Sequence, residues 1–259
     1  MKAREVLIYL SIKFQGDWDK IYHFICEQKK VDSDEVRAAI DNLSCQAVTM
    51  VDEEYPQQLR RISKPPFVLF YIGDYSLTSD VNKNIAVIGS RECTKYGVKH
   101  TRRIVKGICE HLNIVSGMAI GIDSIAQEEC LKNNGKTIAV LGSGIDVCYP
   151  ISNKELYEMI KDVGLVISEF PPGTEAIPSN FPKRNRIIAG LSKALLVTEA
   201  YRQSGTMITV YVALQIGIDV CCIPYPAGHE SACNYLIGQG AYLVENAKDV
   251  LELVTNKKW

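Results

Sequence analysis

The chain has 259 residues, a length that favours a main domain with a smaller domain beside it. Its formal net charge of -1 means that any site for a polyanion must be a local patch, not a property of the whole molecule. No apolar run is long enough to span a membrane, and the nine cysteines have the spacing of neither a disulfide framework nor a zinc site. We therefore expect a cytoplasmic protein with reduced thiols, no membrane contact, and no bound metal or cofactor.

The first sixty residues predict short amphipathic helices. Apolar side chains recur at helical spacing around Leu7, from Trp18 to Ile25 and from Val36 to Leu43, which is typical of helices that pack into a core. A short strand is expected at 67–71, and residues 73–83 predict a linker. We therefore divide the chain into a small helical domain with its connection, residues 1–73, and a second domain, residues 74–259.

From residue 84 onward, short apolar strands alternate with helices. Strands are expected at 85–88, 114–115, 137–141, 165–168, 194–197, 220–223 and 242–244. Continuously apolar strands separated by helices indicate a mainly parallel sheet that is covered on both faces. The expected fold class is α/β, with a doubly wound sheet and a small helical domain before it.

Small and polar residues follow several of these strands. In open α/β sheets, ligands bind beyond the carboxyl ends of the strands, where glycine permits close approach and helix-start N–H groups bind anions. The candidate contacts at these ends are Gly89, Ser90, Arg91, Ser116, Gly117, Gly142, Ser143, Gly144, Ser204, Gly205 and Thr206. Together they predict a site for a phosphate-rich ligand.

Residues 180–200 carry the strongest local signal. Three cations, Lys183, Arg184 and Arg186, stand within four residues at a predicted helix start, where positive charge opposes the helix dipole. Solvated surface charges are the alternative, but the neighbouring strand-end loops favour a bound anion. Phe181 adds an aromatic ring to this segment, and Asn185 extends the candidate set of ligand contacts.

The sequence offers no clear catalytic residue. The dinucleotide fingerprint, the P-loop and the nucleophile elbow are all missing, and the histidines lack metal-ligand spacing. Asp123, Glu169 and Glu199 lie beside strand ends, and we expect them to cap helices or pair with Arg91 and Arg184. Binding without bond cleavage is the resulting hypothesis.

Five segments, taken in chain order, resemble motifs of the DNA-processing protein A (DprA/Smf) family. They are residues 85–91 (IAVIGSR), 116–123 (SGMAIGID), 137–144 (TIAVLGSG), 181–190 (FPKRNRIIAG) and 204–209 (SGTMIT), within a resemblance that covers roughly residues 50–250. It implies a Rossmann-like domain that binds single-stranded DNA, a homodimer, and a protein that protects incoming DNA and loads the RecA recombinase onto it during natural transformation. The N-terminal region is similar to the family's sterile-alpha-motif-like (SAM-like) domain.

Three positions depart from the family pattern. Ile120 stands where a basic residue is usual, Gln127 where histidine is common, and Tyr225 where glycine is usual. These departures affect the expected strength of DNA binding near the three positions, and they do not change the expected fold. The chain ends at Trp259, so the winged-helix domain that many members append is expected to be missing.

Two other classes remain as alternatives. One is a nucleotide-processing enzyme of the lysine-decarboxylase-like (LOG) group, which also places glycine-rich strand ends at a nucleotide phosphate. That group's P-G-G-x-G-T motif is missing here, and the enzyme would need a catalytic acid near an arginine. The other is an adaptor protein, which predicts no phosphate-dependent binding.

Overall fold

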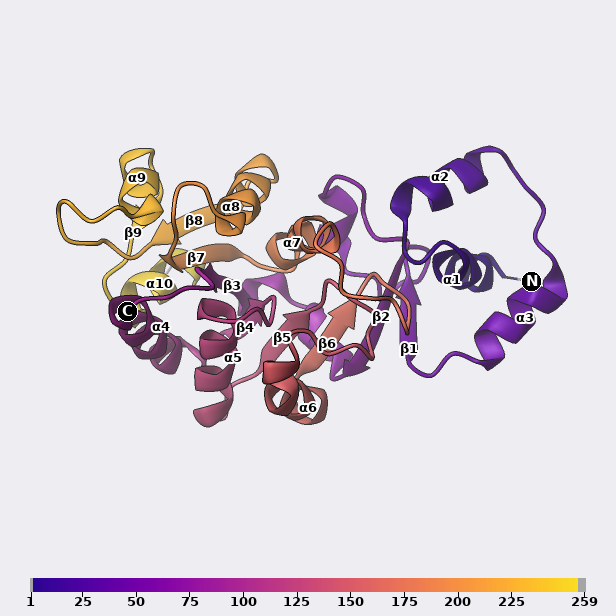
Figure 1. Ribbon diagram of the computed structural model, residues 1–259, viewed down its shortest axis with the longest axis horizontal. Coiled ribbons are helices and arrows are strands. Elements are labelled where there is room, and N and C mark those ends of the chain that lie inside the picture. Colours follow the sequence, from indigo (N-terminus) through magenta and orange to yellow (C-terminus); the bar gives the residue numbers. More distant parts are fainter. Residues whose placement is uncertain (1, 256–259) are drawn as a thin grey trace.

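The computed structural model describes residues 2–255. Three helices come first, and aspartates fix the start of two of them: the side chain of Asp17 accepts from the amide of Lys20, and that of Asp32 accepts from Asp34 and Glu35. The helices are α1 (Ala3–Lys13), α2 (Trp18–Cys26) and α3 (Ser33–Asp41). Figure 1 shows them at one end of an elongated molecule, beyond the edge of the sheet that the first strand forms.

Nine strands form one sheet in the order β1-β2-β6-β5-β4-β3-β7-β8-β9. The first pairs, β1 with β2 and β2 with β6, are antiparallel, and all the others are parallel. The strands are β1 (Gln46–Thr49), β2 (Val68–Gly73), β3 (Asn84–Gly89), β4 (Asn113–Ser116), β5 (Thr137–Val140), β6 (Leu165–Ser168), β7 (Ala194–Glu199), β8 (Asp219–Cys222) and β9 (Tyr242–Leu243). The expected parallel sheet is confirmed.

Helices cover both faces of the sheet, as expected for a doubly wound, Rossmann-like fold (Figure 1). Successive side chains of a strand point to opposite faces, so Ile85 and Val87 pack under one helical layer while Ala86 and Ile88 pack under the other. The first layer holds α4 (Lys95–Ile108), α5 (Ile122–Lys132), α6 (Lys154–Val163) and α10 (Ala247–Thr255). The second holds α7 (Asn180–Gly190), α8 (Gly205–Gln215) and α9 (Ala232–Gly238).

The order of the parallel strands places a switch point between β3 and β7. From β3 the chain adds β4, β5 and β6 in one direction, then crosses to β7 and adds β8 and β9 in the other. The loops that leave β3 and β7 therefore diverge toward opposite faces, which opens a crevice at the carboxyl edge of the sheet. Any ligand site is expected at that edge.

The sheet also extends into the segment that the sequence placed with the N-terminal helices. The strand expected at 67–71 is present as β2, but β1 was not expected. β2 pairs with β6 of the main sheet and β1 pairs with β2, and Phe67 and Phe70 belong to the apolar cluster that includes the N-terminal helices. The division at residue 73 stays a prediction. Within residues 2–255, no helix has the length and apolar character needed to cross a membrane.

Candidate functional site

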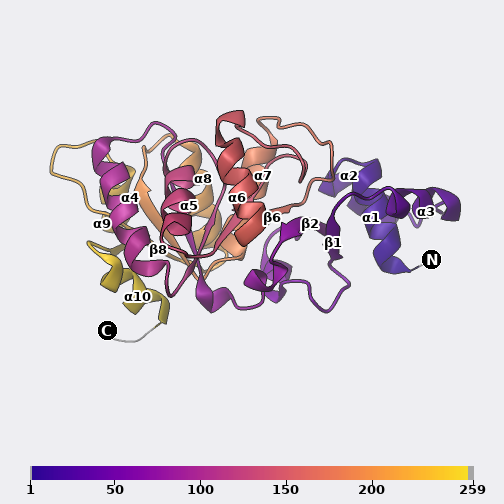
Figure 2. The same cartoon turned by 90° about the horizontal axis from the view of Figure 1, so that it is seen from below.

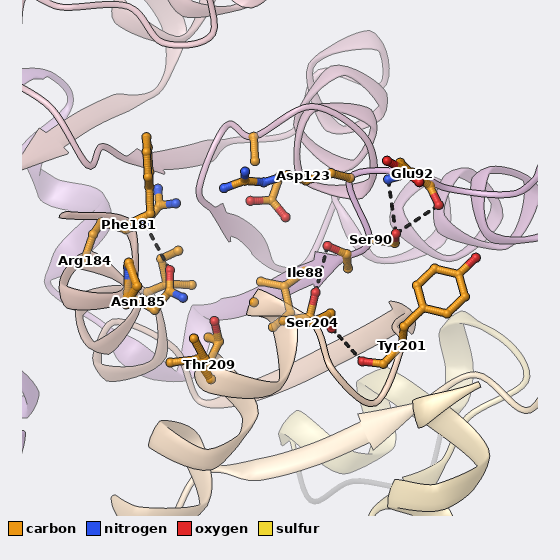
Figure 3. A pocket seen from close by; sticks show the side chains of 18 of the residues that line it. Ile88, Ser90, Glu92, Asp123, Phe181, Arg184, Asn185, Tyr201, Ser204 and Thr209 are labelled. Atoms are coloured by element: carbon orange, nitrogen blue, oxygen red, sulfur yellow. Dashed lines mark hydrogen bonds between the residues drawn. The ribbon is translucent and has the colours of Figure 1, made fainter. Parts of the chain in front are cut away.

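A cavity of about 590 Å³ opens at the switch point, where β3 and β7 end. Its walls are the loops after these two strands, the first turns of α7 and α8, and the start of α5 (Figure 3). Nine of the residues expected from the sequence line it: Gly89, Ser90, Arg91, Phe181, Arg184, Asn185, Ser204, Gly205 and Thr206. Residues far apart in the chain thus meet at the edge where a doubly wound sheet binds ligands.

The other expected residues lie outside this cavity. Ser116 is buried and its hydroxyl donates to the carbonyl of Val87 at 2.7 Å, while the Ser143 hydroxyl donates to Val147 at 2.8 Å. The amide of Gly144 donates to Thr174 at 2.8 Å. The expectation that these loops all contribute to one ligand surface is therefore corrected, because their polar groups are used inside the protein.

Two glycines of this set make room for side chains. A Cβ at Gly142 would lie 2.7 Å from Cδ1 of Phe181, and a Cβ at Gly117 would lie 2.5 Å from Nη2 of Arg184. Gly117 also lines a smaller recess of about 60 Å³ beside the cavity. As expected for glycine, both positions let another group come close to the backbone, but that group is a side chain of the protein and not a ligand.

The α8 helix begins at the cavity without a side-chain cap. The Ser204 hydroxyl donates to the carbonyl of Tyr201 at 2.7 Å, and the Thr206 hydroxyl donates to that of Gly89 at 3.0 Å. Apart from its chain neighbours and the backbone of its own helix, no atom of residues 2–255 lies within 4 Å of where a Cβ of Gly205 would be. The free N–H groups of this first turn therefore offer an anion site.

A cation and two rings stand beside this helix start. The Cζ atom of Arg91 lies 5.6 Å from the ring centroid of Phe181, and the ring of Tyr149 lies 5.5 Å from the same ring. Within residues 2–255, the exposed Arg91 guanidinium makes no hydrogen bond or ion pair, so it can take a phosphate. In Figure 3, Phe181 and Arg184 occupy one end of the cavity and Ser90 and Tyr201 the other.

Arg184 differs from the expectation of a surface contact. Only 4% of the residue is exposed, and Nη1 donates to the carbonyl of Gly117 at 2.8 Å and to that of Val140. Its charge faces the buried carboxylate of Asp123, which accepts from the Gly117 amide at 3.2 Å. Burial lowers the pKa of Arg184 to about 10, so it stays a cation at neutral pH. Arg184 braces the ends of β4 and β5 from below the cavity.

Burial also shifts the pKa of Asp123, which lies near Arg184. Burial raises the pKa of the Asp123 carboxyl above its ordinary value, while the adjacent guanidinium opposes that shift. Asp123 and Arg184 interact electrostatically inside the protein, but within residues 2–255 they form no hydrogen bond or ion pair with each other, so the expected pairing is corrected. The chain turns into α5 directly before Asp123, at Gly121, whose φ of +90° suits glycine.

Arg186, the third cation near the start of α7, also makes its contacts inside the protein. Arg186 binds Glu169 through two parallel contacts, Nη1 to Oε1 at 2.7 Å and Nη2 to Oε2 at 2.6 Å. Its Nε donates to the carbonyl of Lys64 at 3.0 Å, next to the N-terminal helices. Only Lys183 of the three is exposed, and it does not line the cavity.

The structure assigns Glu199 to a helix start. Its carboxylate accepts from the Thr94 amide at 2.9 Å and from the Thr94 hydroxyl at 3.2 Å, so it caps α4 and does not pair with Arg91. Asp123 and Glu199 thus bind backbone amides, and Glu169 pairs with Arg186 and not with the expected Arg91 or Arg184. No group of three or more metal-ligating side chains is assembled among residues 2–255.

Sequence reasoning missed two exposed tyrosines at the cavity. Tyr149 is 49% exposed and Tyr201 is 40% exposed. Tyr201 stands two residues beyond β7 and Tyr149 precedes Pro150 in the loop after β5. For Tyr201 the available signal was an aromatic residue just beyond a strand end, where little core is left to join. Tyr149 lies far along the loop after β5 and carried no such signal.

The positions that depart from the family pattern have distinct surroundings. Ile120 is 54% exposed and lines the small recess, so it faces the site. Gln127 is buried and donates to the Thr137 hydroxyl at 3.1 Å, while the Tyr225 hydroxyl donates to the carbonyl of Thr198 at 3.1 Å. Of the three, only Ile120 lies where it could alter a bound strand.

The family model of DNA recombination-mediator protein A matches residues 46–255. DNA processing protein DprA of Streptococcus pneumoniae is 43% identical over 205 residues, which are 78% of this chain and 72% of that protein. Protein Smf of Synechocystis is 41% identical over 211 residues, 80% of this chain but only 53% of its own length. This chain thus spans about half of some relatives and nearly three quarters of others.

Two solved structures agree with this match. DNA processing protein A from Streptococcus pneumoniae superposes with a TM-score of 0.81 at 36% identity, covering 96% of this chain and 92% of that one. The Helicobacter pylori protein, whose structural study describes a single-stranded DNA binding mode, superposes at 0.74 with 27% identity, covering 83% and 99%. The chain belongs to the DNA recombination-mediator protein A (DprA/Smf) family.

Proposed function

We propose that this protein binds single-stranded DNA at the switch-point cavity. The observation that carries the proposal is the uncapped start of α8 opposite the unpaired guanidinium of Arg91, with the rings of Phe181 and Tyr149 beside it. Helix N–H groups and a guanidinium fork together suit a phosphate. Exposed rings suit an unstacked base, each worth about 1–3 kcal/mol.

Single strands fit this arrangement better than duplex DNA. A base can stack on Phe181 or Tyr149 only if it has left its own stack, and paired bases within a duplex do not expose their faces. The exposed cation among the residues that line the cavity is Arg91, which can hold a phosphate of such a strand. Contacts to phosphate and to ring faces would be tolerant of base sequence.

Binding without bond cleavage is supported by the contacts that the nearby acidic side chains already make. Asp123 lines the cavity, but its carboxylate accepts from the Gly117 amide and interacts electrostatically with Arg184. Glu169 pairs with Arg186 and Glu199 binds Thr94 at the start of α4, so each of these acids has a structural role. A general acid or base needs to reach the bond that it cleaves. The family match likewise does not favour the nucleotide-processing (LOG) alternative.

The wider role is proposed from the family. As a recombination mediator, the protein would protect incoming single strands and load RecA onto them in the cytoplasm during natural transformation, acting as a homodimer. RecA loading is tested by adding the protein to RecA and oligonucleotide coated with a single-strand-binding protein, and following RecA filament formation. No acceleration over RecA alone would refute the loading role.

The binding proposal is tested by titrating single-stranded and duplex oligonucleotides of one length and following fluorescence anisotropy. We expect a clear preference for the single strand, lost in Arg91→Ala and kept in the matched control Arg37→Ala, an exposed arginine of α3. Equal affinity for both forms, or an Arg91→Ala protein that binds normally, would refute the proposed site. Release of free base from a nucleoside monophosphate would instead support an enzyme.

A further inference from the structure

Helix α4 carries a line of positive charge that the cavity does not use. Its fourteen residues include five cations and no acid. Four of the cations are spaced by four, three and four residues, which places them on one helical face. All five are exposed: Lys95, Lys99, Arg102, Arg103 and Lys106. We refer to these five as the α4 stripe.

The α4 stripe faces solvent because the opposite side of the helix is buried. Thr101, Ile104, Val105 and Ile108 pack toward the sheet, and α5 and α10 flank the helix on either side. Figure 2 shows α4 on the outer layer next to α5, with α10 near one end. The stripe is therefore an open surface about 17 Å long, at 1.5 Å per residue.

Few acids neutralise the α4 stripe. Nε of Arg102 lies 3.9 Å from Glu129, and Arg103 donates to a backbone carbonyl, that of Glu245. Across residues 2–255, Lys95, Lys99 and Lys106 make no hydrogen bond or ion pair through their side chains. The nearest acid in the chain before the stripe is Glu92.

This charge pattern costs stability when nothing is bound. A cation in the first turn opposes the helix dipole by about 0.3–1 kcal/mol, and like charges four residues apart repel by about 0.2–0.5 kcal/mol. Two other exposed helices mix both signs: Lys161 pairs with Glu158 on α6 at 2.7 Å, and Lys248 pairs with Glu252 on α10 at 3.9 Å. Helix α7 also has cations and no acid, but its Arg184 is buried and its Arg186 is paired with Glu169, whereas the cations of α4 are all exposed. The exception on α4 points to a polyanion.

The α4 stripe begins at the edge of the sheet that holds the cavity. The loop from Arg91, which lines the cavity, leads in four residues to Lys95. Glu199 at the end of β7 holds the first turn of α4 to that edge through Thr94. A strand that leaves the cavity past Arg91 would therefore meet Lys95 first and the other cations in turn.

We propose that the α4 stripe is a second contact surface for the phosphate backbone of single-stranded DNA, continuing the path of a strand bound at the cavity. This inference rests on the proposed single-strand binding. At about 3.4 Å per nucleotide of a stacked strand, the stripe spans about five phosphates. It presents cations and no exposed ring, so its contacts depend on salt and not on base identity.

The test compares two oligonucleotides and two triple variants. An oligonucleotide of about five nucleotides fills the cavity alone, and one of about twenty also reaches the stripe. The stripe variant is Lys95→Gln, Lys99→Gln and Lys106→Gln. The control removes the same charge at exposed lysines elsewhere: Lys30→Gln, Lys83→Gln and Lys132→Gln. Circular dichroism confirms folding of each, and anisotropy titrations over a salt series give the slope of log affinity against log salt.

We expect the stripe variant to lose about 2 from that slope on the long oligonucleotide, at about 0.7 per phosphate contact, and to keep the wild-type slope on the short one. An unchanged slope on the long oligonucleotide would overturn the inference, while loss of binding in Arg91→Ala would still support the cavity. An equal loss in the control variant would also overturn it, because net charge would then be the cause. Failure of the wild type to bind either oligonucleotide would refute the proposed function and this inference together.

Discussion

Replacing Arg184 with alanine is the sharpest test of how the site is built. The sequence places Arg184 among surface cations, where a substitution usually changes stability by less than about 0.5 kcal/mol. The structure buries it, with hydrogen bonds to the carbonyls of Gly117 and Val140 and with its charge against Asp123. The two descriptions predict very different stabilities for Arg184→Ala.

The magnitude follows from what the truncation leaves behind. Asp123 would remain in the interior without a cation, and two carbonyls at the ends of β4 and β5 would lose their donor. Leaving a buried carboxylate without the cation that compensates its charge costs about 3–5 kcal/mol. For a chain of this size, each kcal/mol lowers the melting temperature by about 2–4 °C, so we expect a fall of about 6–20 °C.

Thermal unfolding followed by circular dichroism measures this fall. The neighbouring Lys183→Ala is the matched control, because Lys183 is exposed on the same turn of α7 and its side chain makes no hydrogen bond or ion pair within residues 2–255. Its melting temperature should stay within about 2 °C of the wild type. If Arg184→Ala melts as high as Lys183→Ala, the buried brace is not what stabilises these strand ends, and the reasoning is refuted.

Three further substitutions test other parts of the site. Arg91→Ala should lower the slope of log affinity against log salt on single strands by about 0.7, the value for one phosphate; an unaltered slope would exclude that contact. Phe181→Ala should weaken binding by about 1–3 kcal/mol with the slope unchanged, and a slope that falls as in Arg91→Ala would contradict stacking. Gly97→Ala should destabilise the fold by about 1–3 kcal/mol, because the new Cβ would lie 1.9 Å from the carboxylate of Glu199 that caps α4. Gly238→Ala, in α9 with open space around it, is the control and should melt no lower than the wild type; equal melting of both would refute the clash.

Strands could be predicted from the sequence where they are buried along their whole length. The expected strand at 165–168 matches β6, and the one at 194–197 lies within β7, because both are buried along their whole length and therefore apolar in sequence. The sequence did not predict β1. That strand is only four residues long, begins with the exposed Gln46 and has no strongly apolar run. Its place is fixed by pairing with β2, a contact between distant segments that no local pattern records.

The position of the site was predictable, but the roles within it were only partly so. Polar strand ends and the carboxyl-edge rule place Ser90, Arg91 and Thr206 together. The roles of Lys183 and Arg184 could not be separated from composition alone, since both are cations in the same turn. About 100° of helical rotation separates neighbours, and that rotation turns Lys183 to solvent and Arg184 toward Gly117.

The cations of this edge therefore divide into an inner and an outer set. Arg184 is held by the carbonyls of Gly117 and Val140 and Arg186 by Glu169, while the Arg91 guanidinium makes no hydrogen bond or ion pair within residues 2–255 and is available to a ligand. Because Arg184 also lines the cavity, weaker DNA binding by Arg184→Ala would not by itself identify a phosphate contact. The slope of log affinity against log salt separates a structural role of Arg184 from a phosphate contact. It is measured well below the melting temperature of the variant, and it should equal the wild-type slope if Arg184 only stabilises the strand ends. A slope lower by about 0.7 would instead place a phosphate on Arg184.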